Sequence, residues 1–110
     1  MMNGIAALAG LELHDTTIDV LRLDFDRKEI EITVLEDGDP EKPIVLHFTG
    51  ISALALGEMI EGEEPEIYSV DFTRLPSGLY KASFMTLLGF SRPSWEFSFE
   101  FADGSARRIR

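Results

Sequence analysis

Apolar and polar residues alternate along much of this 110-residue chain with the two-residue period of a β-strand. The pattern is clearest at 95–101, where aromatic residues stand at the odd positions and polar residues at the even ones. Asp103-Gly104 follows, and this dipeptide is typical of a tight turn because glycine tolerates positive φ. We therefore expect a hairpin over 95–110 whose buried face carries Trp95, Phe97, Phe99 and Phe101.

A second hairpin is predicted earlier, from Ile18–Phe25, a turn at 26–28, and the alternating segment Glu29–Val34. In its first strand the apolar positions change from even to odd between Val20 and Leu21. One extra residue inserted there, a β-bulge, would keep both halves of the strand facing the core.

Three later segments complete the expected strands. In 44–49 the apolar residues share one face, and His47 falls on the other. Tyr68, Val70 and Phe72 mark a strand that ends in a turn at 75–78. Residues 79–90 fit either a strand or a helix, and we favour the strand because that turn precedes it and the aromatic strand follows.

Two segments are ambiguous. Residues 51–60 could form a short helix capped by Ser52, but Gly57 weakens it, so we favour irregular or short extended structure. Residues 1–13 could be a short strand or a helical turn. The Leu13–Ile18 segment is suited to a turn that leads into a strand. We expect one mainly β domain, an antiparallel sandwich or partly open barrel of about seven short strands with at most one short helix.

The charge of the chain narrows the classes of partner. Its net charge is −10, with 20 acidic against 10 basic residues. Phosphate backbones and anionic lipid repel such a surface, whereas a basic protein patch is attracted to it. We therefore expect a protein partner with a basic surface, or self-association, and neither nucleic acid nor membrane.

The absence of cysteine rules out disulfides and a Cys nucleophile. No apolar run approaches the roughly 20 residues of a membrane span, and no Lys or Arg precedes Arg22 as a secretory signal would need. We expect a cytoplasmic protein.

No motif in the sequence indicates a cofactor. Neither glycine-rich phosphate-binding pattern occurs. His14 and His47 lack the spacing of a zinc site, and Asp37-Gly38-Asp39 lacks that of a calcium loop. We expect no metal and no cofactor. The C-terminal Arg107, Arg108 and Arg110 are expected to pair across the late hairpin with Glu96 and Glu100.

Two kinds of candidate site remain. The first is a pair of acidic loops that would face a basic partner, represented by Glu36, Asp37 and Asp39 and by Glu58, Glu61, Glu63 and Glu64. The second is His14 beside Asp15, where the carboxylate could orient the imidazole for acid–base work. The alternative for that pair is a turn in which both side chains bond backbone.

Three short motifs resemble several small uncharacterised bacterial families: Leu13-His14-Asp15, a central strand ending in Phe48 before a short loop, and the late aromatic hairpin. Some of these families are assigned as immunity proteins of bacterial toxin systems. The resemblance implies a small acidic protein that blocks the active site of a toxin, and it brings no catalytic residue.

We therefore expect a non-enzymatic binding protein, such as an immunity-type inhibitor of a basic protein partner. Two alternatives stay open: a small hydrolase-like enzyme that uses His14 and Asp15, and a structural subunit that assembles with copies of itself.

Overall fold

The computed structural model describes residues 8, 11–57, 66–87 and 93–109, and the side chains among them except those of 93–95. Eight strands form one antiparallel sheet in the order β4-β7-β6-β5-β1-β2-β3-β8. The strands are β1 Thr17–Asp24, β2 Glu29–Leu35, β3 Pro43–Thr49, β4 Ser52–Leu56, β5 Glu66–Arg74, β6 Tyr80–Leu87, β7 Pro93–Phe101 and β8 Asp103–Arg108. A short 3-10 turn, η1 Glu36–Gly38, follows β2.

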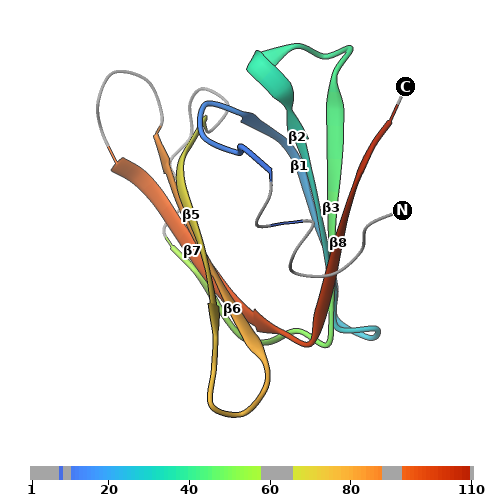
Figure 1. Cartoon of the computed structure of the whole chain (residues 1–110), viewed down its shortest axis with the longest axis vertical. Coiled ribbons are helices and arrows are strands. Elements are labelled where there is room, and N and C mark those ends of the chain that lie inside the picture. The colour runs from blue at the N-terminus through green and yellow to red at the C-terminus, as the bar shows by residue number, and fades with distance from the viewer. Residues whose placement is uncertain (1–7, 9–10, 58–65, 88–92, 110) are drawn as a thin grey trace.

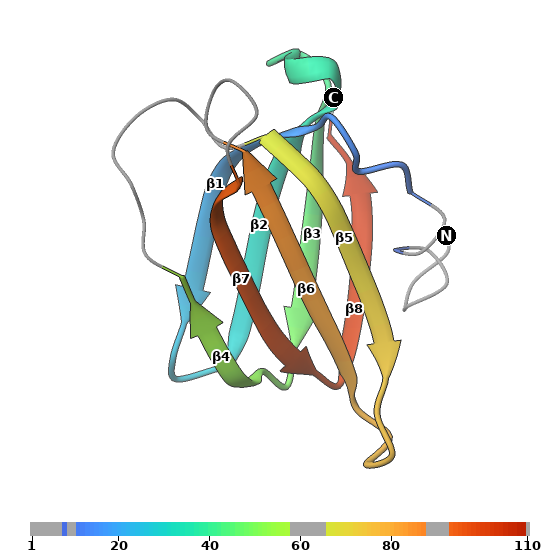
Figure 2. The same cartoon turned by 90° about the vertical axis from the view of Figure 1, so that its left-hand side faces the viewer.

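The sheet folds over on itself into two halves that face each other (Figure 1). One half holds β4, β7, β6 and β5, and the other holds β1, β2, β3 and β8 (Figure 2). Within the described strands, the ladder between the two halves is a single paired position, Thr17 opposite Glu66. The predicted fold class, a mainly β sandwich or partly open barrel, is confirmed. The eighth strand is β4, which lies in the ambiguous segment 51–60 and is extended, as we favoured.

The core lies between the two halves and is largely aromatic. Phe97, Phe99 and Phe101 are buried on the inner face of β7, as the alternation predicted. Phe48 of β3 meets Phe99 and Phe101 from the opposite half, with ring centroids 4.9 Å away in each case and edge-to-face geometry. Such contacts add to the area that the rings bury, so β7 forms the wall on which β3 packs. The Trp95 side chain lies outside the described part.

The predicted hairpin over 95–110 is wrong. β7 pairs with β6 and β4, whereas β8 pairs with β3 in the other half of the sheet. The chain bends at Ala102, whose N–H donates to the Thr49 carbonyl at 2.9 Å, and it crosses from one half to the other there. The arginines of β8 therefore do not face Glu96 or Glu100 across a turn.

Gly104 has a packing role in place of the expected turn role. Gly104 does not have the positive φ that the expected turn would need. A Cβ built on it would lie 2.7 Å from Leu8 Cδ1 and 3.1 Å from Phe48 Cδ1. A side chain here would force Leu8 and Phe48 to shift, so glycine is favoured because both residues pack directly on the backbone.

Two β-bulges set which residues reach the core. The predicted bulge in β1 is confirmed, with the register shift between Ile18 and Val20, one position before the expected site. A second shift lies between Ile67 and Ser69 of β5. It turns Tyr68 outward, 52% exposed, and places Ile67 in the core instead. The pairing of β6 with β5 and β7 confirms that the described part of 79–90 is a strand.

Candidate functional site

A strongly charged hollow lies at one end of the β1–β2–β3 half. We call it the acidic groove. It has a volume of about 710 Å³ and is lined by Arg22, Leu23, Asp24, Phe25, Asp26, Glu29, Glu31 and His47.

Strand register brings the polar side chains of the acidic groove together. Arg22 lies opposite Glu31 on β2, and Glu31 lies opposite His47 on β3. One step nearer the turn, Asp24 lies opposite Glu29. All five side chains project from the outer face because the intervening residues face the core. The hairpin pattern predicted this face for Glu29, Glu31 and His47, but not that they form one site.

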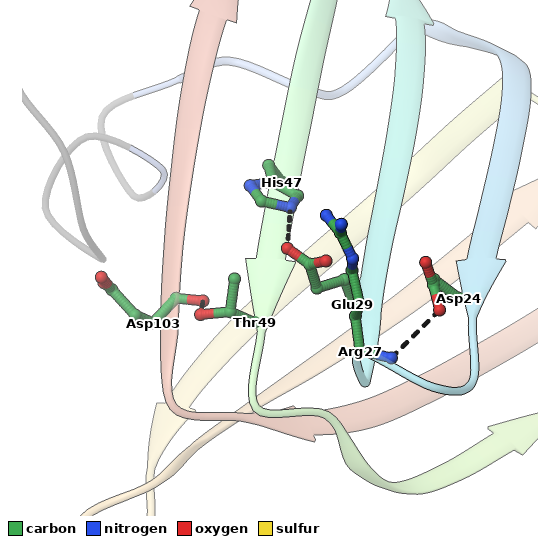
Figure 3. A network of polar contacts seen from close by, with 6 residues as sticks. All are labelled: Asp24, Arg27, Glu29, His47, Thr49 and Asp103. Carbon is green, nitrogen blue, oxygen red and sulfur yellow. Dashed lines mark hydrogen bonds and ion pairs between the residues drawn. The ribbon is translucent and has the colours of Figure 1, made fainter.

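The His47 ring is held by a carboxylate in the acidic groove. Its Nε2 lies 3.0 Å from Glu29 Oε1, and the two side chains are 39% and 25% exposed (Figure 3). At the turn, the Arg27 backbone N–H donates to Asp24 Oδ1 at 3.0 Å. These bonds fix Asp24 and Glu29, whereas Asp26 and Glu31 make no side-chain hydrogen bond within the described residues and stay available to a cation.

Phe25 adds an apolar contact to the edge of this groove. Its parity along β1 predicts an inward side chain, but β1 ends at Asp24 and Phe25 belongs to the following turn. The Phe25 side chain is 78% exposed as a result. The reason is the turn over 25–28, in which Lys28 has φ +55, so strand alternation no longer applies. Exposed aromatic residues beside a charged hollow are typical of protein-binding surfaces.

The acidic groove carries four carboxylates against one guanidinium, a net charge of −3 with neutral His47. The charges are spread along two strands. Among the described residues, no three His, Asp or Glu side chains are grouped so as to hold a metal ion.

The first predicted acidic loop, which holds Glu36, Asp37 and Asp39, does not line the acidic groove. Glu36 is held by Arg108 in an ion pair, and Asp39 Oδ1 accepts a bond from the Glu41 N–H at 2.9 Å. Asp37 is exposed, with φ +54. The charge of Glu36 is therefore partly neutralised by Arg108, and Asp39 already accepts a local hydrogen bond. This loop also lies at the far end of β2 from the acidic groove, about 20 Å away at the usual rise of a strand. Glu58, Glu61, Glu63 and Glu64 lie outside the described residues.

The predicted His14–Asp15 site is present as a pair. His14 Nδ1 lies 3.1 Å from Asp15 Oδ2, and the two side chains are 61% and 65% exposed. The His14 ring also meets the Tyr68 ring edge-on, with centroids 5.8 Å apart. A hollow of about 320 Å³ lies beside them, lined in part by Ser69 and Phe72.

The turn that holds this pair is built by backbone bonds. Asp15 has φ +69, and its N–H donates to the Ile67 carbonyl at 2.9 Å. Thr16 is buried, and its hydroxyl donates to the Leu13 carbonyl at 2.7 Å. The Leu13-His14-Asp15-Thr16 turn thus fastens β1 to β5. It leaves the His14 and Asp15 side chains mostly exposed to solvent.

A third hollow, of about 470 Å³, lies over the outer face of the other half. Its floor is made of small residues at neighbouring positions, because Ser83 lies opposite Ser98 and Ser98 opposite Ala55. Asp71 and Glu96 stand at its sides. It offers no group of charges comparable to the acidic groove.

Comparison with protein-family models, with curated proteins and with solved structures finds no match. Any inference about function therefore rests on the geometry of the acidic groove. Among the described residues, no helix is long and apolar enough to cross a membrane.

Proposed function

We propose that this protein is a non-enzymatic binding protein whose acidic groove receives a basic patch of a protein partner, as an immunity-type inhibitor would. The observation that supports this most directly is the 78% exposure of Phe25 beside a hollow lined by Asp24, Asp26, Glu29 and Glu31. The carboxylates supply attraction for lysine and arginine, and the ring supplies apolar area for their methylene stems or for a neighbouring apolar residue.

Attraction by the acidic groove has a characteristic dependence on salt. A net acidic surface raises the association rate with a basic partner, and this effect weakens as ions screen it over about 8 Å at physiological ionic strength. The Phe25 contact does not weaken with salt in the same way, because apolar burial does not depend on charge. The complex should therefore lose affinity at high salt through slower association.

The enzyme alternative has less support. His14 and Asp15 form the pair that acid–base chemistry would use, but both side chains are mostly exposed. Efficient acid–base catalysis needs a positioned substrate and a site that limits water. The groove, by contrast, combines charge, shape and an apolar anchor in one place.

The test compares capture of partners by variants that carry equal charge. Asp26→Asn with Glu31→Gln removes two carboxylates from the acidic groove without removing a described side-chain bond. Asp37→Asn with Asp71→Asn removes two exposed carboxylates elsewhere, one on η1 and one on the other half of the sheet. Tagged proteins are exposed to native lysate at low and high salt, and the captured proteins are identified by mass spectrometry.

The proposal expects a basic protein that the natural chain and the Asp37/Asp71 control capture at low salt, and that the groove variant loses. Phe25→Ala should lose the same protein with the charges intact. Equal capture by both charge variants would show that only net charge matters, and would contradict a groove site. Capture of no protein by the natural chain at either salt concentration would also contradict it.

A further inference from the structure

The hollow of about 470 Å³ on the outer face of the β4–β7–β6–β5 half has no part in the function proposed above. Figure 2 looks onto this face, where the four strands lie side by side. We call the hollow the serine trough, because three serines line it. Its volume lies within the range of small-molecule sites, roughly 300–1,000 Å³.

Strand register brings the polar side chains of the serine trough together. Ser83 of β6 lies opposite Asp71 of β5 on one side and opposite Ser98 of β7 on the other. In the next row, Ser69 of β5 and Glu96 of β7 lie opposite the same residue of β6, from its two sides. All five side chains line the trough.

The polar groups of the serine trough have bonding capacity that the protein leaves unused. Within the described residues, none of the five side chains makes a hydrogen bond or an ion pair. The three serines are partly buried, whereas Asp71 and Glu96 are exposed. Partly buried hydroxyl groups without a protein partner bond to water or to a ligand.

The two carboxylates stand on a diagonal across the trough. Asp71 and Glu96 are two strands apart and two residues apart along the strand, so their Cα atoms are separated by about 12 Å at the usual strand spacing and rise. Each has a serine two residues away on its own strand, Ser69 beside Asp71 and Ser98 beside Glu96. Among the described residues that line the trough, no cation offsets these two charges.

Each end of this diagonal suits an ammonium group. An ammonium group has three N–H donors and no acceptor, and a carboxylate with a neighbouring hydroxyl supplies acceptors for it. At ordinary single-bond lengths, about eight atoms between two nitrogens span the distance from one end to the other. Leu56, which is 48% exposed, and Met85 also line the trough and offer apolar surface to a methylene chain.

We propose that the serine trough binds a linear polyamine, with one terminal ammonium at Asp71, the other at Glu96 and the chain between them across Ser83. A lysine side chain of a protein fits less well, because it carries one ammonium and would leave the second carboxylate without an opposite charge. A neutral polyol would leave both carboxylates so.

Titration with spermidine, which has an ammonium at each end, tests the proposal. The nitrogen-15-labelled protein is followed by two-dimensional NMR at physiological ionic strength, where charges more than about 8 Å away are largely screened. The amide signals of Ser83 and Ser98 should shift together and give one dissociation constant. Octylamine, which has a similar length and one ammonium, should bind at least tenfold more weakly.

Two variants that lose equal charge separate a site from general attraction to an acidic protein. Asp71→Asn with Glu96→Gln should weaken spermidine binding at least tenfold. Asp26→Asn with Glu31→Gln, the matched control in the acidic groove, should change it by less than twofold. Thermal unfolding should be the same for both, because all four side chains are exposed or partly exposed.

Ser83→Leu fills the floor of the serine trough without changing its charge, and should also abolish binding. If this variant fails to fold, the two charge variants still decide. The absence of shifts at the trough, equal binding of octylamine, or equal losses in both charge variants would overturn the proposal. These outcomes do not depend on capture of a protein by the acidic groove, which the lysate experiment tests separately.

Discussion

Arg108 of β8 forms a hydrogen-bonded ion pair with Glu36, the residue that follows β2, although β3 lies between the two strands. Nη1 donates to Oε1, and Nη2 donates to Oε2 at 3.1 Å, so the guanidinium bonds both carboxylate oxygens. The bond to Arg108 lowers the pKa of Glu36 below its ordinary value, and the same bond raises the pKa of Arg108. The pair anchors η1 to the C-terminal strand.

Glu36→Gln should lower stability slightly at neutral pH and not at all in strong acid. A lowered folded-state pKa contributes stability above the unfolded pKa, and this contribution is lost as the pH falls through the folded pKa. The effect is small because both side chains are exposed. Urea unfolding of both proteins across the acid range measures it. A difference that persists unchanged in strong acid would show that Glu36 acts by packing rather than by charge.

Phe99→Ala should lower the free energy of unfolding by roughly 3 to 5 kcal/mol, because the ring is fully buried and its removal leaves a cavity. Phe25→Ala is the matched control: the same atoms are removed from a side chain that is 78% exposed. It should change stability by less than about 0.5 kcal/mol. Chemical denaturation measures both, and equal losses would contradict the assignment of one ring to the core and the other to the surface.

Gly50→Ala should cost more stability than Gly78→Ala. Both glycines have positive φ, +66 and +92, a conformation that costs about 1–2 kcal/mol for other residues. A Cβ at Gly78 meets nothing within 4 Å, whereas one at Gly50 lies 2.7 Å from the Ala102 Cβ. The difference between the two variants in thermal unfolding isolates the steric part. Equal losses would mean that the chain at Ala102 moves aside freely.

Gly104→Ala should lower stability by about 1–3 kcal/mol through overpacking. The new methyl group meets Leu8 Cδ1, and Leu8 is 1% exposed and has little room to move. Leu8→Val combined with Gly104→Ala should cost less than the sum of the single changes, because the shorter side chain leaves room. Strict additivity in the double-mutant cycle would contradict direct contact between the two residues.

Local pattern was enough to place most strands. Alternation at 29–34, 44–49 and 95–101 predicted β2, β3 and β7, because a sheet with one buried face requires a period of two. The parity change near Val20 predicted the bulge in β1. Tyr68, Val70 and Phe72 marked the strand β5, but nothing in a single strand shows the second bulge between Ile67 and Ser69 that turns Tyr68 outward.

The sequence pattern could not show which strands pair with one another. Asp103-Gly104 has the composition of a turn, but its glycine instead leaves room for Leu8, about a hundred residues earlier in the chain. The acidic groove was missed for a related reason. Its residues come from β1, β2, the turn between them and β3. Only the pairing register of these strands brings Arg22, Glu31 and His47 into one row.

The passage of the chain from β7 into β8 at Ala102 has a consequence for folding. β7 lies between β4 and β6, and β8 completes the pairing of β3, so the segment that follows residue 92 belongs to both halves of the sheet. A nascent chain that lacks this segment has no partner for β4 and no aromatic wall for Phe48. The two halves therefore share one core only when the segment after residue 92 is in place, so folding of the whole sheet depends on it.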